Sequence, residues 1–189
     1  WDDSLVGVAS IDPGSKLLRF RSPCGHPPGA FASPRNAKAH QYVVWNVREG
    51  MLAPGQWYLD RTRGCIVYWP RPEEDLAETT VLAPRHRRIL AIEGTADEPA
   101  RQITVRGLGL ALTSTALGSA GFGAGALDAA LDVRGPAEDI EIRRVAVRLA
   151  GGKGIGVRPT GPDAPCRNVR VHNCRVEDCA GPGIHLRGE

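Results

Sequence analysis

The chain has 189 residues, a formal net charge of +3, 24% charged residues and 5% aromatic residues. This length allows one or two small domains, and no stretch approaches the roughly 18 consecutive apolar residues of a membrane-spanning helix. A nucleic-acid-binding protein usually has a concentrated basic face with aromatic side chains, whereas here the basic residues are spread out apart from Arg85–Arg88 (RHRR). We therefore expect no membrane span and no nucleic-acid partner, and we expect Arg85–Arg88 to be a solvated turn before a strand.

Residues 1–84 predict a small antiparallel β domain, either a barrel or a sandwich. Leu5–Ile11 and Lys16–Arg21 alternate on either side of Asp12–Ser15, whose sequence DPGS is typical of a turn. The next segment, residues 22–38, is rich in Pro, Gly, Ser and Ala and predicts an irregular loop.

A strand that runs into a short helical turn is predicted at Gln41–Glu49, and a hairpin is predicted after it. Its strands are Trp57–Asp60 and Cys65–Trp69, and Gly64 can adopt the left-handed conformation that a type I turn with a bulge requires. The hairpin carries four aromatic residues that could stack on a sugar ring. The alternation turns at least half of them inward, so we expect them to pack in the core of the domain instead.

From residue 85 onward, a short pattern recurs in which two aliphatic residues, one apart, precede a charged residue and a Gly. It reads LAIEG, LDVRG, IGVRP and IHLRG at Leu90–Gly94, Leu131–Gly135, Ile155–Pro159 and Ile184–Gly188. Period-two alternation indicates strands, and repetition at intervals of about 20–50 residues indicates a solenoid. An array of amphipathic helices is the alternative, but no stretch has the apolar spacing of a helix.

A second pattern lies between these units and sets their register. It places aliphatic residues at four positions of Ile103–Leu110 and Ile140–Val147 and at three of the same four positions of Val169–Val176, where Cys174 takes the other. It predicts two strands joined by a two-residue corner. Three strands per repeat predict a triangular coil, in which each strand pairs in parallel with its copies in the neighbouring coils. Residues 85–189 therefore predict a parallel β-helix of about three coils.

The first repeat contains an insert. Val147 and Ile155 are eight residues apart, whereas Leu110 and Leu131 are 21 residues apart. The additional residues include Ala116–Ala126 (ALGSAGFGAGA), whose Ala- and Gly-rich composition predicts a mobile loop at one corner of the coil.

The five cysteines are odd in number, and their spacing matches no zinc motif. His172, Cys174, Cys179 and His185 can be imagined as ligands, but Cys174 takes an aliphatic position of the repeat and is better explained as a small core residue. We expect no metal and no cofactor. The chain begins at Trp1 and ends at Glu189 directly after a strand unit, so we expect both ends to be cuts through a longer protein.

Three motifs surround the predicted hairpin: WNVRE at Trp45–Glu49, PGQWYLD at Pro54–Asp60 and GCIVYWP at Gly64–Pro70. They resemble the N-x-x-E, PGEWYLD and G-x-x-Y-Y-x-P signature of large right-handed parallel β-helix proteins, with Gln56 in place of Glu. Many members are glycoside hydrolases, including fucosidase- and xylanase-type enzymes. The resemblance implies a small β domain inserted at the start of a right-handed β-helix that is truncated at its C-terminus. It also implies further coils after Glu189, from which the catalytic carboxylates of such enzymes generally come.

In each repeat unit the second and fourth residues should point out of the coil. The two outward columns are Ala91, Asp132, Gly156 and His185, and Glu93, Arg134, Arg158 and Arg187. Stacked arginines repel one another, so Glu93, Glu189, a missing coil or an anionic ligand should offset their charge. Because guanidinium groups suit carboxylates and sulfates, we predict that Arg134, Arg158 and Arg187 bind an acidic sugar; the alternative is solvated arginines that form salt bridges with nearby loops.

Glycoside cleavage needs two carboxyl groups about 5–9.5 Å apart. Asp132 is the acid of the first outward column, and Asp178 follows the third copy of the second pattern. The candidate catalytic residues are therefore Asp132, with an acid from a missing coil, and Asp178 with His185. The alternative for each acid is a solvated surface residue.

Three functions compete at this point. The leading prediction is a fragment of a carbohydrate-active β-helix enzyme, a glycoside hydrolase that acts on a polysaccharide or oligosaccharide outside the cytoplasm, in the extracellular or periplasmic space. The second is a non-catalytic β-helix that serves as an adhesin or scaffold. The third is a polysaccharide lyase or epimerase that acts on uronates, which the arginine column would suit.

Overall fold

The computed structural model describes residues 2–27, 30 and 42–188. Most of the predicted loop at residues 22–38, the first residue of the predicted strand at Gln41, and the counter-charge Glu189 lie outside the described residues. The chain divides into two compact units, Trp1–Pro27 with Ala83–Glu189, and Pro28–Leu82. No helix among the described residues is long and apolar enough to cross a membrane.

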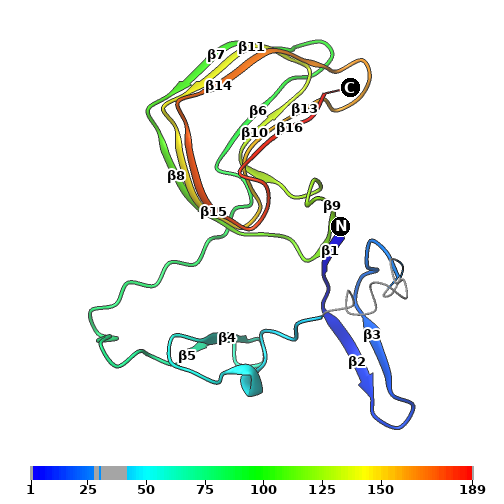
Figure 1. Ribbon diagram of the computed structural model, residues 1–189, viewed down its shortest axis with the longest axis vertical. Helices are drawn as coiled ribbons and strands as arrows, with labels where there is room; N and C mark the ends of the chain where they lie inside the picture. Colours follow the sequence, from blue (N-terminus) through cyan, green and yellow to red (C-terminus); the bar gives the residue numbers. More distant parts are fainter. Residues whose placement is uncertain (1, 28–29, 31–41, 189) are drawn as a thin grey trace, which may run out of the picture. The chain divides into compact units, whose positions relative to one another are not determined.

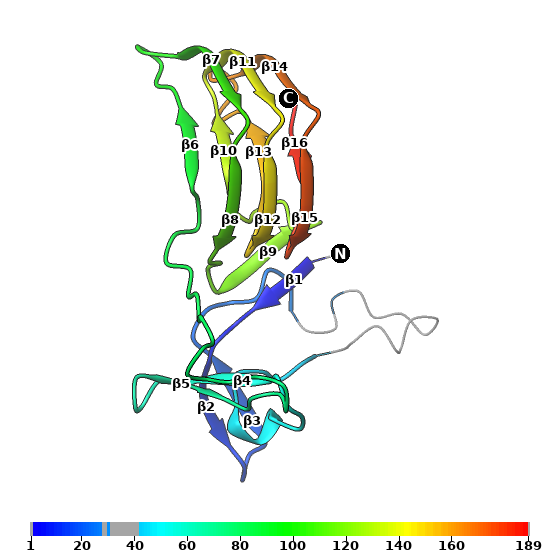
Figure 2. The same cartoon turned by 90° about the vertical axis from the view of Figure 1, so that its left-hand side faces the viewer.

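Three parallel sheets form the repeat region, and in Figure 1 they make up three sides of the stacked coils. The first sheet contains β6 (Leu90–Glu93), β10 (Ala129–Arg134), β13 (Lys153–Arg158) and β16 (Ile184–Leu186). The second contains β7 (Ala100–Arg106), β11 (Ala137–Arg143) and β14 (Cys166–His172). The third contains β8 (Gly109–Thr113), β12 (Ala146–Ala150) and β15 (Arg175–Cys179). Figure 2 shows equivalent strands lying side by side. The all-β class and the parallel sheets are confirmed, and they are consistent with a β-helix-like fold.

The strand register is the one that the repeats predict. Leu131 lies opposite Leu90 and Ile155, and the second pattern pairs in the same way, since Ile140 lies between Ile103 and Val169. The alternating aliphatic residues stack into one core, in which the middle coil is the most buried: Leu131 and Val133 are 0% exposed. In the last strand, by contrast, Leu186 is 64% exposed.

The glycine of the repeat unit is explained by a close backbone approach. A Cβ at Gly94 would lie 2.0 Å from the carbonyl oxygen of Pro136, and a Cβ at Gly135 would lie 2.0 Å from that of Ala164. In both cases the backbone of the next coil occupies the space of a side chain. Any larger residue would therefore push two coils apart at this corner.

Left-handed backbone conformations also recur in register. The corner between the second and third sheets contains Gly107, Arg144 and Asn173, with φ of 69°, 51° and 54°. Within the third sheet, Leu112, Leu149 and Asp178 form another such column, with φ of 65°, 53° and 52°. Residues other than Gly, Asn and Asp are disfavoured in this conformation, so these columns impose a local cost at Arg144, Leu112 and Leu149.

The Ala- and Gly-rich insert is not simply a loop, and that prediction needs correction. Residues Gly118–Phe122 form β9, which pairs antiparallel with β1 (Asp2–Leu5) near the start of the chain. Ala120 is 5% exposed, so the strand is packed. The composition gave no sign of a strand because the pairing partner lies more than a hundred residues away in the sequence.

The predicted hairpin before residue 22 is present as β2 (Val8–Asp12) and β3 (Leu17–Phe20). The carboxylate of Asp12 accepts hydrogen bonds from the backbone amides of Gly14 and Ser15 at 2.9 and 3.3 Å. This is the local bonding that the DPGS sequence predicts.

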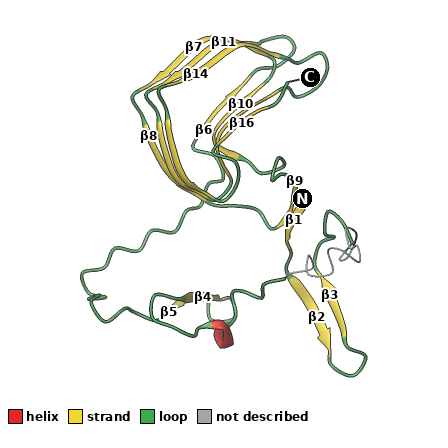
Figure 3. Cartoon of the chain, viewed as in Figure 1, coloured by secondary structure: helices red, strands yellow, loops and turns green. Residues whose placement is uncertain are grey.

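The second unit contains the other predicted hairpin, β4 (Trp57–Asp60) and β5 (Cys65–Tyr68) (Figure 3). Oδ1 of Asn46 accepts a hydrogen bond from the backbone amide of Leu59 at 2.8 Å, and Nδ2 of Asn46 donates one to the carbonyl of Leu59 at 3.2 Å. Oε1 of Gln56 accepts hydrogen bonds from the amides of Leu52 and Ala53; a glutamate could accept the same bonds. Residues 42–47 form no strand, and the predicted helical turn is the 3-10 helix η2 (Arg48–Gly50).

Candidate functional site

The outer face of the sheet β6–β10–β13–β16 brings most of the predicted site residues together. Asp132 lies opposite Ala91 and Gly156, and His185 lies opposite Gly156 on the far side. In the neighbouring column, Arg134 lies between Glu93 and Arg158. Arg187 follows β16 and continues the ladder, since its backbone amide donates to the carbonyl of Val157 at 2.9 Å.

Asp132 is covered, although its column lies on the outer side of the sheet. The residue is 1% exposed. Its Oδ2 accepts a hydrogen bond from Nε of Arg134 at 2.8 Å and forms an ion pair with Nη2 of the same residue at 2.7 Å. Guanidinium nitrogens of Arg88 and Arg158 lie at 3.9 and 4.0 Å from it. Its Oδ1 has no hydrogen-bond partner within the described residues. This carboxylate serves as the counter-ion of several arginines and does not face solvent.

Carboxylates of the chain itself offset the charge of the first arginine of the ladder. Arg134 bonds Asp128 at 2.9 Å and Asp132 at 2.7 Å, and its Nε lies 3.5 Å from Glu93. Burial alone would lower the pKa of Arg134, but its contacts with these three acids outweigh burial and raise the pKa.

The other two arginines of the ladder are not balanced in this way. Among the described residues, the acid nearest to Arg158 is Asp132 at 4.0 Å, and the buried Nε of Arg158 has no hydrogen-bond partner there. Arg187 is exposed and forms no ion pair with any residue among 2–27, 30 and 42–188. Both guanidinium groups therefore have donors available for an external anion.

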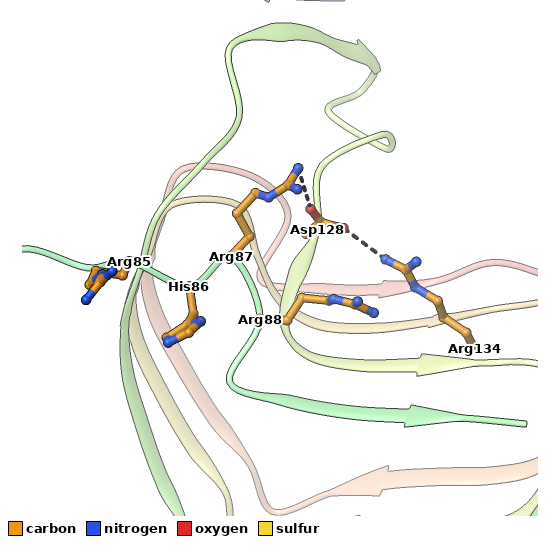
Figure 4. Close-up of a pocket in the computed structure, with 6 residues that line it drawn as sticks. All are labelled: Arg85, His86, Arg87, Arg88, Asp128 and Arg134. Carbon is orange, nitrogen blue, oxygen red and sulfur yellow. Dashed lines mark hydrogen bonds and ion pairs between the residues drawn. The ribbon is translucent and has the colours of Figure 1, made fainter.

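Arg85–Arg88 lines a hollow beside the ladder, together with Asp128 and Arg134, and the hollow has a volume of about 510 Å³ (Figure 4). Asp128 is held from both sides, at 3.5 Å by Arg87 and at 2.9 Å by Arg134. The expected exposed segment before a strand is present, since residues 85–87 are exposed and β6 begins at Leu90, but the ion pair with Asp128 was not expected. Leu90 lies opposite Leu131, and counting back three residues on both strands puts Arg87 opposite Asp128. The repeat register of the sequence therefore indicated this ion pair.

Lys153 is a second buried charge on this face that sequence reasoning missed. The first residue of β13, it is 1% exposed, and its Nζ donates to the carbonyl of Gly125 in the insert at 3.1 Å. Burial lowers the pKa of Lys153, and the charge of Arg158 lowers it further. The sequence gave no sign of a buried lysine, because the surrounding residues, GGKG, resemble an ordinary corner of the coil.

His185 is half-buried among cations. Burial lowers the pKa of its imidazole, and the charges of Lys153, Arg187 and Arg158 lower it further. Its Nδ1 is buried and has no hydrogen-bond partner in the described part of the chain. Burial and the surrounding cations therefore both favour the neutral form of this imidazole over the imidazolium.

Asp178 lies elsewhere. It belongs to β15 in the third sheet, whereas His185 belongs to β16 in the first sheet. Asp178 is exposed and occupies the left-handed column of Leu112 and Leu149. Asp tolerates this backbone conformation better than most residues do, so the backbone conformation alone explains an Asp at position 178.

The face as a whole has an excess of positive charge. The seven cationic side chains around Asp132 and the hollow are Arg85, Arg87, Arg88, Arg134, Lys153, Arg158 and Arg187, and the three carboxylates among them are Glu93, Asp128 and Asp132. Within the described residues, no group of three or more His, Cys, Asp and Glu side chains is arranged to hold a metal ion. The chemistry that this arrangement offers is binding of an anion by guanidinium groups.

Comparison with known proteins gives no relative: no family model, no curated protein and no solved structure matches the chain.

Proposed function

We propose that this chain is part of a carbohydrate-active, right-handed β-helix protein with a small antiparallel β domain, and that its basic face binds an acidic polysaccharide. The parallel register of the sheets supports the β-helix. The observation that carries the binding role is the pair Arg158 and Arg187. These two guanidinium groups stand in one column and have few or no acidic partners among the described residues.

A flat array of this kind suits a sugar polymer that carries carboxylates or sulfates. Neighbouring strands of a sheet are about 4.8 Å apart, so Arg134, Arg158 and Arg187 present cationic groups at regular short intervals. Planar guanidinium groups bind carboxylates and sulfates through paired hydrogen bonds. Leaving Arg158 Nε buried and unpaired is unfavourable, and an anionic ligand would relieve that cost.

The described coils favour binding over hydrolysis. An acid catalyst of glycoside cleavage must exchange a proton with its substrate, whereas Asp132 is buried and held by Arg134. We propose that any glycoside hydrolase activity of the whole protein uses other acids and that this face positions the polymer.

A second candidate function is proton abstraction from a uronate, as in a lyase or an epimerase, and His185 favours it. This neutral imidazole lies beside Arg158 and Arg187. A base next to cations that neutralise a carboxylate is the arrangement needed to remove the proton on the adjacent carbon.

The test is affinity electrophoresis of the purified protein in gels that contain neutral or acidic polysaccharides, with released products assayed in parallel. We expect retardation by polyuronates and sulfated glycans, weaker at high salt, and none by neutral glucans or xylans. Formation of unsaturated uronate would favour the second candidate, and new reducing ends without unsaturation would favour hydrolysis. A folded protein that no acidic polymer retards would overturn the proposal and favour a scaffold or adhesin.

A further inference from the structure

The hollow beside the ladder is a built feature of the coil. The segment that carries Arg85–Arg88 is fixed at two points: the amide of Ser114 donates to the carbonyl of His86, and the amide of Ile89 donates to that of Ala130, both at 2.9 Å. The charged side chains of the segment therefore project from backbone that is bonded to β10 and to the residue that directly follows β8.

The lining of the hollow is strongly cationic and partly pre-oriented. Four arginines and one histidine face a single carboxylate, Asp128. Arg87 and Arg134 each direct one nitrogen at Asp128 (Figure 4), which holds both side chains in place. Because a guanidinium has five N–H donors, each of these arginines has donors left for a ligand. Arg85 forms no ion pair within the described residues.

The size of the hollow fits a sugar unit better than a single ion. Its volume of about 510 Å³ falls in the usual range for ligand pockets, about 300–1,000 Å³. Arg134 belongs both to this lining and to the ladder, in which it pairs with Arg158 on the next strand. The hollow and the free arginines are thus two ends of one continuous basic track that runs across the strands.

We propose that the hollow lined by Arg85, His86, Arg87, Arg88, Asp128 and Arg134 is a second anionic subsite, which holds the carboxylate- or sulfate-bearing unit at one end of an oligosaccharide whose other end lies on Arg158 and Arg187. This inference rests on the proposed function and adds to it the direction and minimum length of the ligand. Arg158 and Arg187 are one and two strands beyond Arg134, or about 5 and 10 Å, so a ligand must extend over several sugar units to fill both ends. Asp128 would repel an anion at the centre of the hollow and direct it towards Arg85 and Arg87.

The experiment compares the affinity of the whole chain for an oligouronate dimer and for a hexamer of the same sugar by titration calorimetry. We expect the hexamer to bind at least about tenfold more tightly, because it alone fills both subsites. The double variant Arg85→Gln/Arg87→Gln should lose about tenfold in affinity for the hexamer and little for the dimer. The control Arg101→Gln/Arg106→Gln makes the same charge change on β7 in another sheet, and it should alter neither affinity by more than about twofold.

The outcomes separate the two proposals. If the dimer binds but the hexamer binds no more tightly, or if the hollow variant, like the control variant, keeps its hexamer affinity within about twofold of the unchanged protein, the second subsite is wrong and the proposed function stands. If neither acidic oligosaccharide binds to the folded protein, as judged by circular dichroism, both are wrong.

Discussion

Replacing Asp132 by Asn tests the structural account of the site most sharply, because the substitution removes one negative charge and almost no volume. Asp132 is 1% exposed, and its Oδ2 holds Arg134 through one hydrogen bond of 2.8 Å and an ion-pair contact of 2.7 Å. After the change, Arg134, Arg158 and Lys153 remain close together with less counter-charge. Breaking a buried ion pair by removing one partner costs about 3–5 kcal/mol. We expect Asp132→Asn to lie at the lower end of that range, since the amide oxygen can still accept from Arg134.

The assay is urea-induced unfolding followed by circular dichroism, with Asp178→Asn as the matched control. Asp178 is exposed and lies in the left-handed region at φ 52°, where Asn is equally acceptable, so the control should change the free energy of unfolding by less than about 0.5 kcal/mol. A loss of about 3 kcal/mol is a large part of the roughly 5–15 kcal/mol of a typical domain. Equal stability of Asp132→Asn and Asp178→Asn would refute the reasoning, because it would mean that Asp132 is not the buried counter-ion of the arginines.

Three further predictions follow from the corners and from His185. Gly135→Ala should destabilise the fold by about 1–3 kcal/mol, because its Cβ would lie 2.0 Å from a carbonyl oxygen of the next coil; Gly109→Ala, with open space around it, should be neutral or slightly stabilising in the same urea titration. Arg144→Gly should raise the thermal midpoint by relieving about 1 kcal/mol of left-handed strain at φ 51°; an unchanged or lower midpoint would count against it. Folding lowers the pKa of His185. The contribution of the neutral His185 to stability is therefore complete above the unfolded pKa of about 6.5, and it is lost as the pH falls through the lower pKa of the folded state. Thermal melts between pH 7.5 and 5 should therefore show a smaller loss of stability for His185→Gln than for the unchanged protein, and parallel curves would contradict this.

Much of the repeat region could be predicted from the sequence, because the relevant information is local and periodic. The alternation around Leu131 and its copies in the other units specifies which residues face the core. Repeats of equal spacing specify which strands pair, as the register of Ile140 with Ile103 and Val169 shows. Such a coil contacts only its neighbours, so few long-range contacts remain to be guessed.

The features that escaped prediction depend on contacts between distant residues. β9 exists because Gly118–Phe122 pairs with the beginning of the chain, and no local pattern marks that partner. The burial of Asp132 depends on how Arg88, Arg134 and Arg158 fold over it. A period-two pattern assigns a residue to the outer face but does not show what covers that face.

The candidate site was predicted only in part, because a local pattern gives the position of a residue but not its contacts with distant residues. The two outward columns were correctly placed next to each other, since their geometry follows from the register alone. The role of Arg87 required extending the register past the edge of β6 into a segment without strand pattern. Whether Arg134, Arg158 and Arg187 bind a substrate remains a prediction.

The most direct test of acidic-sugar binding is the affinity of a polyuronate hexamer for Arg158→Gln/Arg187→Gln, compared with Arg148→Gln/Arg175→Gln. Both double variants remove two positive charges, but the second pair lies on β12 and β15 in the third sheet. If the basic face of the first sheet is the binding surface, the first variant should lose about tenfold or more in affinity, as expected when charge-assisted hydrogen bonds are removed. The second variant should stay within about twofold of the unchanged protein. Equal losses in both variants would contradict the account, because binding would then depend on net charge and not on this face.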